Sequence, residues 1–207
     1  MSIPTNHMML DERSSIMAKD SSQATTPLID FVTAFQQGAV VAYPTEAVFG
    51  LGCDPDNQDA VEKVLAIKTR PQDKGVILIA ANIEQLLPYI DITTLDSSIL
   101  RNVYATWPGP FTWIMPKAAH VPDYLTGGRD TIAVRVSAHP VVIELCQAVN
   151  KPLVSTSANP SGAEPARSIE QVRAYFAQTV FAIDGKVNHN AQPSKIQDAI
   201  TGQVLRG

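Results

Sequence analysis

Residues 153–162, Leu-Val-Ser-Thr-Ser-Ala-Asn-Pro-Ser-Gly, constrain the fold and the chemistry of this chain more than any other segment. Two apolar residues typical of a buried strand are followed by small hydroxyl and amide side chains, and Pro160 and Gly162 then end regular structure. Open α/β folds bind ligands where strands end in such loops. Hydroxyls and backbone N–H groups suit phosphate or carboxylate oxygens. The stretch therefore predicts an anion site at a strand end, although a plain polar turn would have the same composition.

The composition favours a single core and limits the range of partners. The 207 residues, 45% of them hydrophobic, are enough to bury one substantial core. The formal net charge of −4 excludes an overall basic surface, so a nucleic-acid contact would need a local patch. Two cysteines form neither a disulfide framework nor a zinc set, and the four histidines show no metal-ligand spacing. Because apolar runs are too short for a membrane span and no signal peptide is recognisable, we expect a cytoplasmic protein without a membrane partner.

The chain divides into a short polar segment and a long patterned one. Residues 1–24 are polar and rich in Ser, and we expect them to be a disordered N-terminal extension. Residues 25–207 alternate between helical and strand patterns without an internal repeat or a linker, which favours one α/β domain. The patterns predict helices over 27–37, 57–70, 82–87, 94–105, 140–149 and 169–176. They predict strands over 39–43, 75–80, 111–115, 131–137, 153–154, 179–183, 199–200 and 204–205.

Two other segments carry polar residues in unusual surroundings. Thr45 and Glu46 lie in the stretch 44–52, whose Pro and Gly content indicates a loop of fixed shape with a close backbone approach. A simple turn hydroxyl for Thr45 and a helix cap for Glu46 remain alternatives. Arg135 lies in the middle of an apolar strand pattern, where a cation needs an anionic partner. A structural carboxylate and a bound ligand would both satisfy it.

Three cations lie close together around the end of a predicted helix. Lys68 and Arg70 occupy the end of the second helix, and Lys74 follows in the next loop. Cations at this position also favour the helix dipole, which is a purely structural explanation. Their number within seven positions nevertheless indicates an anion site, and they would supply the positive charge that the hydroxyl-rich strand end lacks.

Several enzyme motifs are absent from the sequence. It contains no Gly-x-x-x-x-Gly-Lys-Ser/Thr phosphate loop, no Gly-x-Gly-x-x-Gly fingerprint and no Gly-x-Ser-x-Gly elbow. What remains is a set of hydroxyls with Lys and Arg, which suits positioning and charge stabilisation. Phosphoryl and nucleotidyl transfer need little more than this and a metal ion.

Five stretches, in this order and spacing, resemble the threonylcarbamoyl-AMP synthase family (the YrdC-like proteins), in its short, single-domain bacterial form. They are Ala-Tyr-Pro-Thr-Glu at 42–46 with Phe-Gly-Leu-Gly at 49–52, Lys-Thr-Arg-Pro at 68–71, Trp-Pro-Gly-Pro-Phe-Thr at 107–112, Ile-Ala-Val-Arg at 132–135 with Ala-His-Pro at 138–140, and Ser-Thr-Ser-Ala-Asn-Pro-Ser-Gly at 155–162. The resemblance covers about residues 28–206. It implies a twisted mixed sheet, flanked by helices, around a concave, positively charged cavity.

The resemblance also implies a reaction. L-Threonine, bicarbonate or carbon dioxide, and ATP with Mg²⁺ would give L-threonylcarbamoyl-AMP and pyrophosphate. The product would serve the threonylcarbamoyl modification of adenosine 37 in tRNA, through a separate transfer complex. Whether this chain makes a weak direct contact with tRNA stays open.

Residue roles follow from the same resemblance. The catalytic set, which would stabilise charge on the ATP phosphates and the carbamate, is Lys68, Arg70, Ser157 and Asn159. Threonine would be bound by Thr45, Arg135 and Ser194. The nucleotide side would add Thr131, Ser155 and Arg206 to the catalytic set. The loop 68–74 is the candidate for closure over the substrates.

Two positions depart from the family pattern. Phe49 stands where many members have Tyr, so a hydroxyl role there is lost. Ile79 falls where the longer branch of the family has a His on the threonine side, so that contact is not transferred.

Two other functions compete with this interpretation. The first is an RNA-binding module for double-stranded RNA or tRNA without adenylate formation, which the net charge of −4 disfavours. The second is the related carbamoyl-adenylate chemistry of hydrogenase maturation, whose zinc sites cannot be built from two cysteines.

Overall fold

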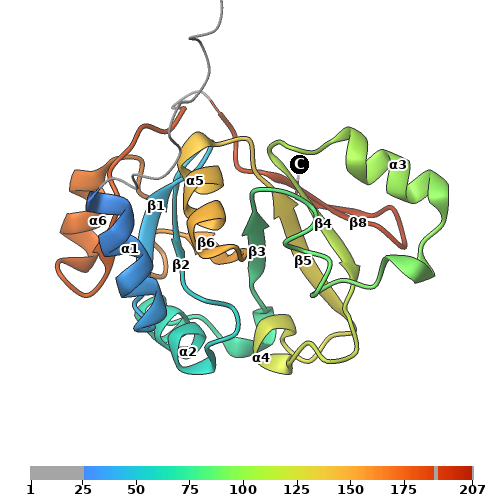
Figure 1. Cartoon of the computed structure of the whole chain (residues 1–207), viewed down its shortest axis with the longest axis horizontal. Helices are drawn as coiled ribbons and strands as arrows, with labels where there is room; N and C mark the ends of the chain where they lie inside the picture. The colour runs from blue at the N-terminus through green and yellow to red at the C-terminus, as the bar shows by residue number, and fades with distance from the viewer. Residues whose placement is uncertain (1–25, 189–190, 207) are drawn as a thin grey trace, which may run out of the picture.

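The computed structural model describes residues 26–188 and 191–206. The predicted N-terminal extension lies outside the described residues. The helices are α1 (Thr26–Gln36), α2 (Gln58–Ile67), η1 (Gln72–Lys74), η2 (Ile92–Thr94), α3 (Ser97–Ala105), α4 (Asp123–Thr126), α5 (Pro140–Val149) and α6 (Ile169–Phe176) (Figure 1). The strands are β1 (Val41–Pro44), β2 (Phe49–Gly52), β3 (Ile77–Ala80), β4 (Phe111–Pro116), β5 (Thr131–Val136), β6 (Leu153–Ser157), β7 (Phe181–Ala182), β8 (Lys195–Asp198) and β9 (Val204–Arg206).

The strands form one twisted mixed sheet in the order β7-β1-β2-β6-β3-β5-β4-β8-β9 (Figure 1). β1 and β7, β3 and β5, and β4 and β8 pair in parallel, and the other neighbours pair antiparallel. Helices cover both faces of this sheet. The predicted α/β class is therefore confirmed.

Two apolar cores lie on opposite faces of the sheet because successive strand residues point to opposite sides. Val41 and Tyr43 of β1 join the core formed with α1 and α5, whereas Ala42 between them joins the core formed with α2 and α6. Figure 1 shows α1 and α5 side by side across β1, β2 and β6. Their cover does not reach the far end of β6, where hydroxyl residues replace apolar ones. This exposed part of the sheet is where a cavity forms.

A row of register partners crosses the sheet at this place. Ser155 of β6 pairs with Ile77 of β3, which pairs with Ala133 of β5, which in turn pairs with Ile114 of β4. Register partners point to the same face of a sheet, so these four side chains form a continuous floor. All four line the cavity described below.

Several predicted elements differ from the observed ones. Residues 49–52, expected in a loop, form β2, and a Cβ on Gly52 would lie 1.8 Å from the Val154 carbonyl oxygen, so the glycine permits this close pairing. Residues 84–89 form turns instead of a helix, because only a few residues separate Asn82 from Pro88 and a helix nucleus is costly. The helix predicted over 94–105 begins at Ser97, the loop 120–128 contains α4, and the first strand of the final hairpin is 195–198.

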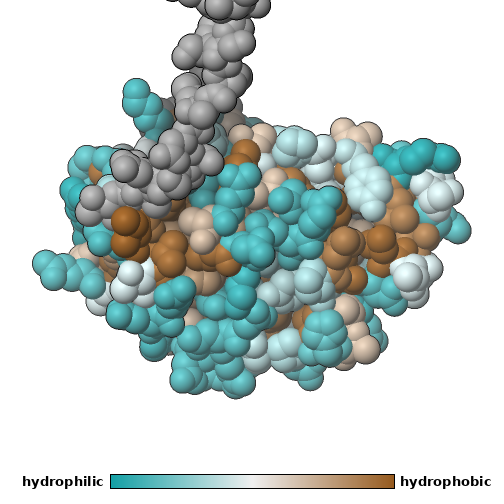
Figure 2. Space-filling view, viewed as in Figure 1, coloured by the Kyte–Doolittle hydropathy of each residue, from teal (hydrophilic) through white to brown (hydrophobic). Residues whose placement is uncertain are grey.

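The outer surface is mainly hydrophilic in the view of Figure 2, with apolar residues gathered over α1 and beneath α3. Large apolar side chains that are exposed include Ile29 on α1 and Ile200 in the turn between β8 and β9. In the described part of the chain, no helix has the length and apolar character required to cross a bilayer.

Candidate active site at the carboxyl end of β6

The cavity above the floor of the sheet has a volume of about 380 Å³. Its walls come from the loop before β2, the loop before β3 and the C-terminal strands β8 and β9. Seven of the ten predicted site residues line it, namely Thr45, Arg70, Arg135, Ser155, Ser157, Ser194 and Arg206. The fold thus brings together side chains from segments that are far apart in the sequence.

The cavity is strongly cationic although the chain as a whole is acidic. Among the described residues, its lining contains four cations, Arg70, Lys74, Arg135 and Arg206, and one carboxylate, Glu46. The formal net charge of the whole chain is −4. A concave site lined by one sign of charge concentrates ligands of the opposite sign. The arrangement suits a polyanion.

Two of these arginines are held by neutral groups. Arg70 donates from Nε and Nη2 to the carbonyl oxygen of Gly75 at 3.3 and 3.0 Å. Arg206 donates to the carbonyl and hydroxyl oxygens of Ser194, both at 2.9 Å. Burial lowers the pKa of both guanidinium groups from its usual value, with Asp73 opposing this at Arg70 and Arg135 adding to it at Arg206. Arginine stays charged at neutral pH, and carbonyl partners orient this charge without cancelling it.

Lys68 lies behind the lining and supports the hydroxyl-rich loop. Its ammonium group donates to the carbonyl of Ser157 and to the carbonyl and side-chain oxygens of Asn159, the last two at 2.9 and 3.1 Å. The Ser157 hydroxyl donates to the same Asn159 Oδ1 at 2.6 Å. The structure therefore brings Lys68, Ser157 and Asn159 together, but only Ser157 reaches the cavity lining.

The environment of Lys68 disfavours its charged form. The side chain is only 7% exposed, and the groups that accept its hydrogen bonds carry no full negative charge. Burial, with a smaller contribution from nearby Arg70, lowers the pKa of Lys68 from 10.5 to about 8. The ammonium thus loses its proton much closer to neutrality than an ordinary lysine does.

Arg135 has an internal carboxylate partner. Its Nη2 forms an ion pair with Glu46 Oε2, and its Nε donates to the Gly109 carbonyl at 3.0 Å. Glu46 Oε1 also accepts from the Ser137 hydroxyl at 2.9 Å and from the Ala138 N–H at 3.1 Å. Of the two alternatives left open by the sequence, the structural carboxylate is therefore present. The helix cap considered for Glu46 is wrong, because the side chain ties its loop to the end of β5.

The predicted threonine-side hydroxyls already form internal hydrogen bonds. Thr45 Oγ1 donates to the Val48 carbonyl at 2.7 Å, so the oxygen keeps its lone pairs for a donor in the cavity. Ser194 Oγ lies 3.0 Å from Thr112 Oγ1 and accepts from Arg206. Sequence reasoning singled out Glu46 but gave it no place in the binding set, and it missed Thr112. The position of Thr112 beside Phe111 in a quoted family stretch was the available signal.

Thr131 does not line the main cavity. It lies in an adjoining cavity of about 240 Å³. The two cavities share the residues Lys74, Gly75, Val76, Ile114, Ala133 and Leu205. Of the two departures from the family pattern, Phe49 lines the main cavity, whereas Ile79 is buried in the core beneath α1 and α5.

Comparison with known proteins identifies the family. Residues 33–207 match the Sua5/YciO/YrdC family model, whose description is telomere recombination. This protein belongs to the Sua5/YciO/YrdC family. The threonylcarbamoyl-AMP synthase of Yersinia enterocolitica is 51% identical over 190 residues, which cover 92% of this chain and 99% of that protein. The protein of the same name from Vibrio vulnificus is 53% identical over 176 residues, covering 84% and 95%.

A solved structure shares the fold. The crystal structure of P. abyssi Sua5 complexed with L-threonine superposes with a TM-score of 0.76 at 32% identity. The match covers 83% of this chain and 50% of that one, so the chain spans about half the length of that protein.

Proposed function

We propose that this protein is a threonylcarbamoyl-AMP synthase, which joins L-threonine, bicarbonate or carbon dioxide, and ATP to give L-threonylcarbamoyl-AMP and pyrophosphate. The observation that carries the proposal is the cationic cavity, with four cations against one carboxylate, on an acidic chain. The curated relatives of that name, at 51–53% identity over most of the chain, support it.

The cavity offers separate groups for the two substrates. The nucleotide phosphates would be bound by Arg70 and Ser157, with Lys68 and Asn159 holding that loop from behind. Ser155 and Arg206 line the same cavity, and Thr131 lies next to it. For threonine, the Thr45 oxygen would accept from the ammonium or hydroxyl group, and Ser194 would face the side chain. Arg135 would bind the carboxylate beside Glu46, which holds the guanidinium in place.

The chemistry requires little more than charge stabilisation. Addition of the threonine amine to carbon dioxide, with loss of a proton, gives a carbamate. A carbamate oxygen then attacks the α-phosphorus of ATP, and the bond to the β-phosphate oxygen breaks to release pyrophosphate. Negative charge grows on the leaving group and around the α-phosphate. Fixed cations that need no reorganisation stabilise such a transition state.

Mg²⁺ belongs to this proposal as a companion of ATP. Residues 26–188 and 191–206 contain no group of three or more His, Cys, Asp or Glu side chains that could hold a metal ion. The cavity carboxylate, Glu46, is engaged by Arg135 and Ser137. Phosphate oxygens and water are sufficient ligands for Mg²⁺ that enters with its nucleotide.

The proposal is tested by product analysis. Purified protein is incubated with Mg²⁺, ATP, bicarbonate and threonine, and the products are analysed by mass spectrometry, with each component omitted in turn. Threonylcarbamoyl-AMP that requires all three substrates is expected. Nucleotide binding without an adduct, together with salt-sensitive tRNA binding, would overturn the proposal in favour of the RNA-binding alternative. The downstream transfer complex, a direct tRNA contact and a cytoplasmic location remain predictions from the sequence.

A further inference from the structure

The turn between the two cations Lys68 and Arg70 has an unusual backbone conformation. Thr69 has a φ angle of +49°, in the left-handed region that favours glycine. In the described part of the chain, two further residues other than glycine have a positive φ, Asn150 and Ala177. Asn is tolerated there, whereas a β-branched residue such as Thr is an outlier. The conformation of Thr69 therefore costs free energy that a glycine would not.

Two backbone hydrogen bonds hold this turn at the end of α2. The Thr69 N–H donates to the Ala66 carbonyl at 3.0 Å, and the Arg70 N–H donates to the Leu65 carbonyl at 2.9 Å. This pair of bonds defines a Schellman motif, whose left-handed position is usually occupied by glycine. The Thr69 side chain is exposed, so it gains no buried contact that would offset the cost of its conformation. The turn must therefore be explained by the residues on either side of it.

The two neighbours of Thr69 serve the same end of β6. In a continuous α-helix, residues two positions apart point in nearly opposite directions, because each residue rotates the side chain by about 100°. Here Lys68 donates to the Ser157 carbonyl, and Arg70 lines the cavity together with Ser157. The charge of Arg70 also contributes, after burial, to the lowered pKa of Lys68, so the two cations are close. The left-handed turn thus brings both cations to the hydroxyl-rich strand end.

We infer that Thr69 is a positioning residue, whose strained backbone directs the Arg70 guanidinium into the cavity before the nucleotide binds. The inference rests on the proposed function, in which Arg70 binds the phosphates. A glycine could adopt the same φ without strain, but it would leave the turn many other conformations. The branched side chain of Thr69 excludes most of these conformations at a cost in stability.

A restricted turn suits the chemistry of the cavity. Fixed cations stabilise developing phosphate charge most effectively when they need no reorganisation during the reaction. The hydrogen bonds from Arg70 to the Gly75 carbonyl orient the far end of the side chain, and the turn at Thr69 fixes the backbone from which it starts. The chain thus exchanges some stability for a guanidinium that is already in place.

The test compares variants of the full chain at Thr69. Thr69→Gly should raise the thermal midpoint by about 2 °C, because the backbone strain is removed. The same variant should raise the dissociation constant of ATP, measured by calorimetry without threonine, about three- to fivefold, because the turn that carries Arg70 is no longer restricted. The value of kcat/KM for ATP should fall at least as much, whereas KM for threonine should stay within about twofold. Wild-type ATP affinity together with wild-type kcat/KM in Thr69→Gly would overturn the inference.

Two conservative variants separate the backbone of Thr69 from its hydroxyl group. Thr69→Val keeps the branched shape without the hydroxyl, so it should bind ATP within about twofold of the wild type. Thr69→Asn, which tolerates a positive φ, should gain stability and keep its ATP affinity. A loss of ATP affinity in Thr69→Val as large as that in Thr69→Gly would overturn the inference, because the hydroxyl would then be the acting group.

Ala177→Gly is the matched control. Ala177 follows α6, has the same φ of +49° and is not among the residues that line the cavity. The control should raise the thermal midpoint by a similar amount and leave ATP affinity and kcat/KM unchanged. Equal losses of ATP affinity in Ala177→Gly and Thr69→Gly would overturn the inference, because any added glycine would then have the same effect.

Product analysis of the wild type separates the two proposals. Threonylcarbamoyl-AMP formation, with wild-type ATP affinity and kcat/KM in Thr69→Gly, would leave the proposed function and remove only the role of Thr69. Absence of the adduct in the wild type would remove the proposed function. In that case, weaker ATP binding by Thr69→Gly than by Ala177→Gly would still support the positioning of Arg70, and equal binding would overturn it.

Discussion

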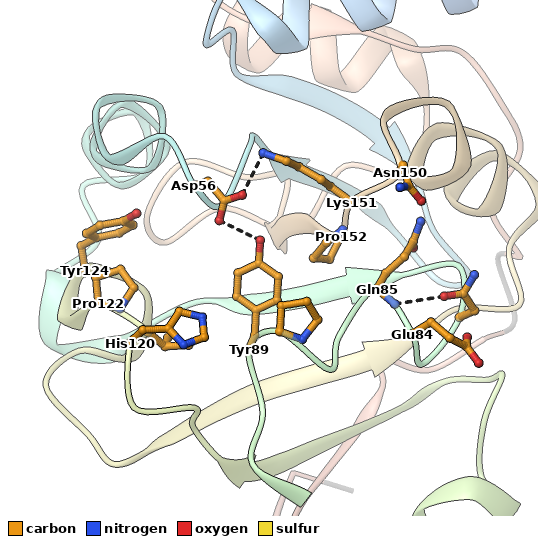
Figure 3. Close-up of a pocket in the computed structure, with 13 residues that line it drawn as sticks. Asp56, Glu84, Gln85, Tyr89, His120, Pro122, Tyr124, Asn150, Lys151 and Pro152 are labelled. Carbon is orange, nitrogen blue, oxygen red and sulfur yellow. Dashed lines mark hydrogen bonds and ion pairs between the residues drawn. The ribbon is translucent and has the colours of Figure 1, made fainter.

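Two cavities lie at opposite ends of β6 and differ in how their charges are balanced. The cavity at its carboxyl end, with a volume of about 380 Å³, is lined by Ser155 and Ser157. The one at its amino end, with about 700 Å³, is lined by Asn150, Lys151 and Pro152 (Figure 3). The larger hollow is not the one that gathers the predicted site residues.

In the amino-end cavity, the charged and polar groups satisfy one another. Lys151 Nζ lies 2.8 Å from Asp56 Oδ2 and 3.2 Å from Asp54 Oδ2, and the Tyr89 hydroxyl donates to Asp56 Oδ1 at 2.8 Å. Figure 3 shows the Asp56 carboxylate between the Tyr89 hydroxyl and the Lys151 ammonium. A cation between two carboxylates attracts little further negative charge. Uncompensated charge, more than volume, distinguishes the candidate active site from the amino-end cavity.

The two lysines show the same contrast through their pKa values. Burial, reinforced by Arg70, lowers the pKa of Lys68 to about 8. At Lys151, burial also acts to lower the pKa, but hydrogen bonds and charge interactions with Asp56 and Asp54 outweigh it and raise the pKa above its ordinary value. Lys68 is thus short of negative charge, which an anionic substrate would supply.

The largest expected effect is that of removing an uncompensated cation from the active site. Arg70→Ala should lower kcat/KM for adenylate formation by at least about 100-fold, because no other group replaces its charge beside the phosphates. The thermal midpoint should change little, since among the described residues the hydrogen bonds of the Arg70 side chain go to the Gly75 carbonyl. The control is Lys151→Gln in the amino-end cavity. Equal losses of kcat/KM in both variants would contradict the conclusion that uncompensated charge sets the active site apart from the amino-end cavity.

The second effect concerns Arg135, the active-site cation that is paired with a carboxylate, Glu46. Arg135→Gln should raise KM for threonine about 10- to 100-fold, because the substrate carboxylate loses a charged donor. The single change also leaves Glu46 buried without its partner, so the variant Glu46→Gln/Arg135→Gln is measured beside it. Threonine affinity like that of the wild type in both variants would show that Arg135 pairs with Glu46 but does not bind threonine.

The third effect is a pH dependence that only one cavity should show. ATP affinity, measured by calorimetry without threonine, should fall about tenfold between pH 7.5 and 9.5. The reason is that Lys68, with a pKa of about 8, loses its proton in this range, whereas the arginines keep theirs. Lys151, whose pKa is raised, should stay charged there. An affinity that is constant to pH 9.5 would mean that the Lys68 charge does not assist nucleotide binding.

The local structure of this chain, such as its helix caps, could be predicted from the sequence. The contacts between residues far apart in the sequence could not. Ser168 caps α6 and Pro140 begins α5 as the sequence indicates, because capping and helix initiation depend on nearby residues. Seven predicted site residues do meet in one cavity. Glu46 and Arg135 are 89 positions apart, and only the sheet register and the fold of the loop before β2 bring them together.

The same distinction explains the partial success with Lys68 and Thr131. The sequence places Lys68 at a helix end, but whether its ammonium faces the cavity or supports the loop behind it depends on the route of residues 157–159. Thr131 points to the cavity face of β5 as alternation requires, yet the division of that face into two cavities comes from the packing of the Gly75 and Gly127 loops. Such packing between loops leaves no periodic signal in the sequence.

The smallest expected effect lies in the amino-end cavity, and it concerns stability alone. Tyr89→Phe removes the hydroxyl that donates to Asp56 and should lower the free energy of unfolding by about 1 kcal/mol, which for a chain of this size corresponds to about 2–4 °C in Tm. Adenylate formation at 25 °C should stay within about twofold of the wild type, because the bond lies at the other end of β6 from the cationic cavity. A loss of activity without a loss of stability would mean that the amino-end cavity takes part in the reaction, and the charge criterion that separates the two cavities would then fail.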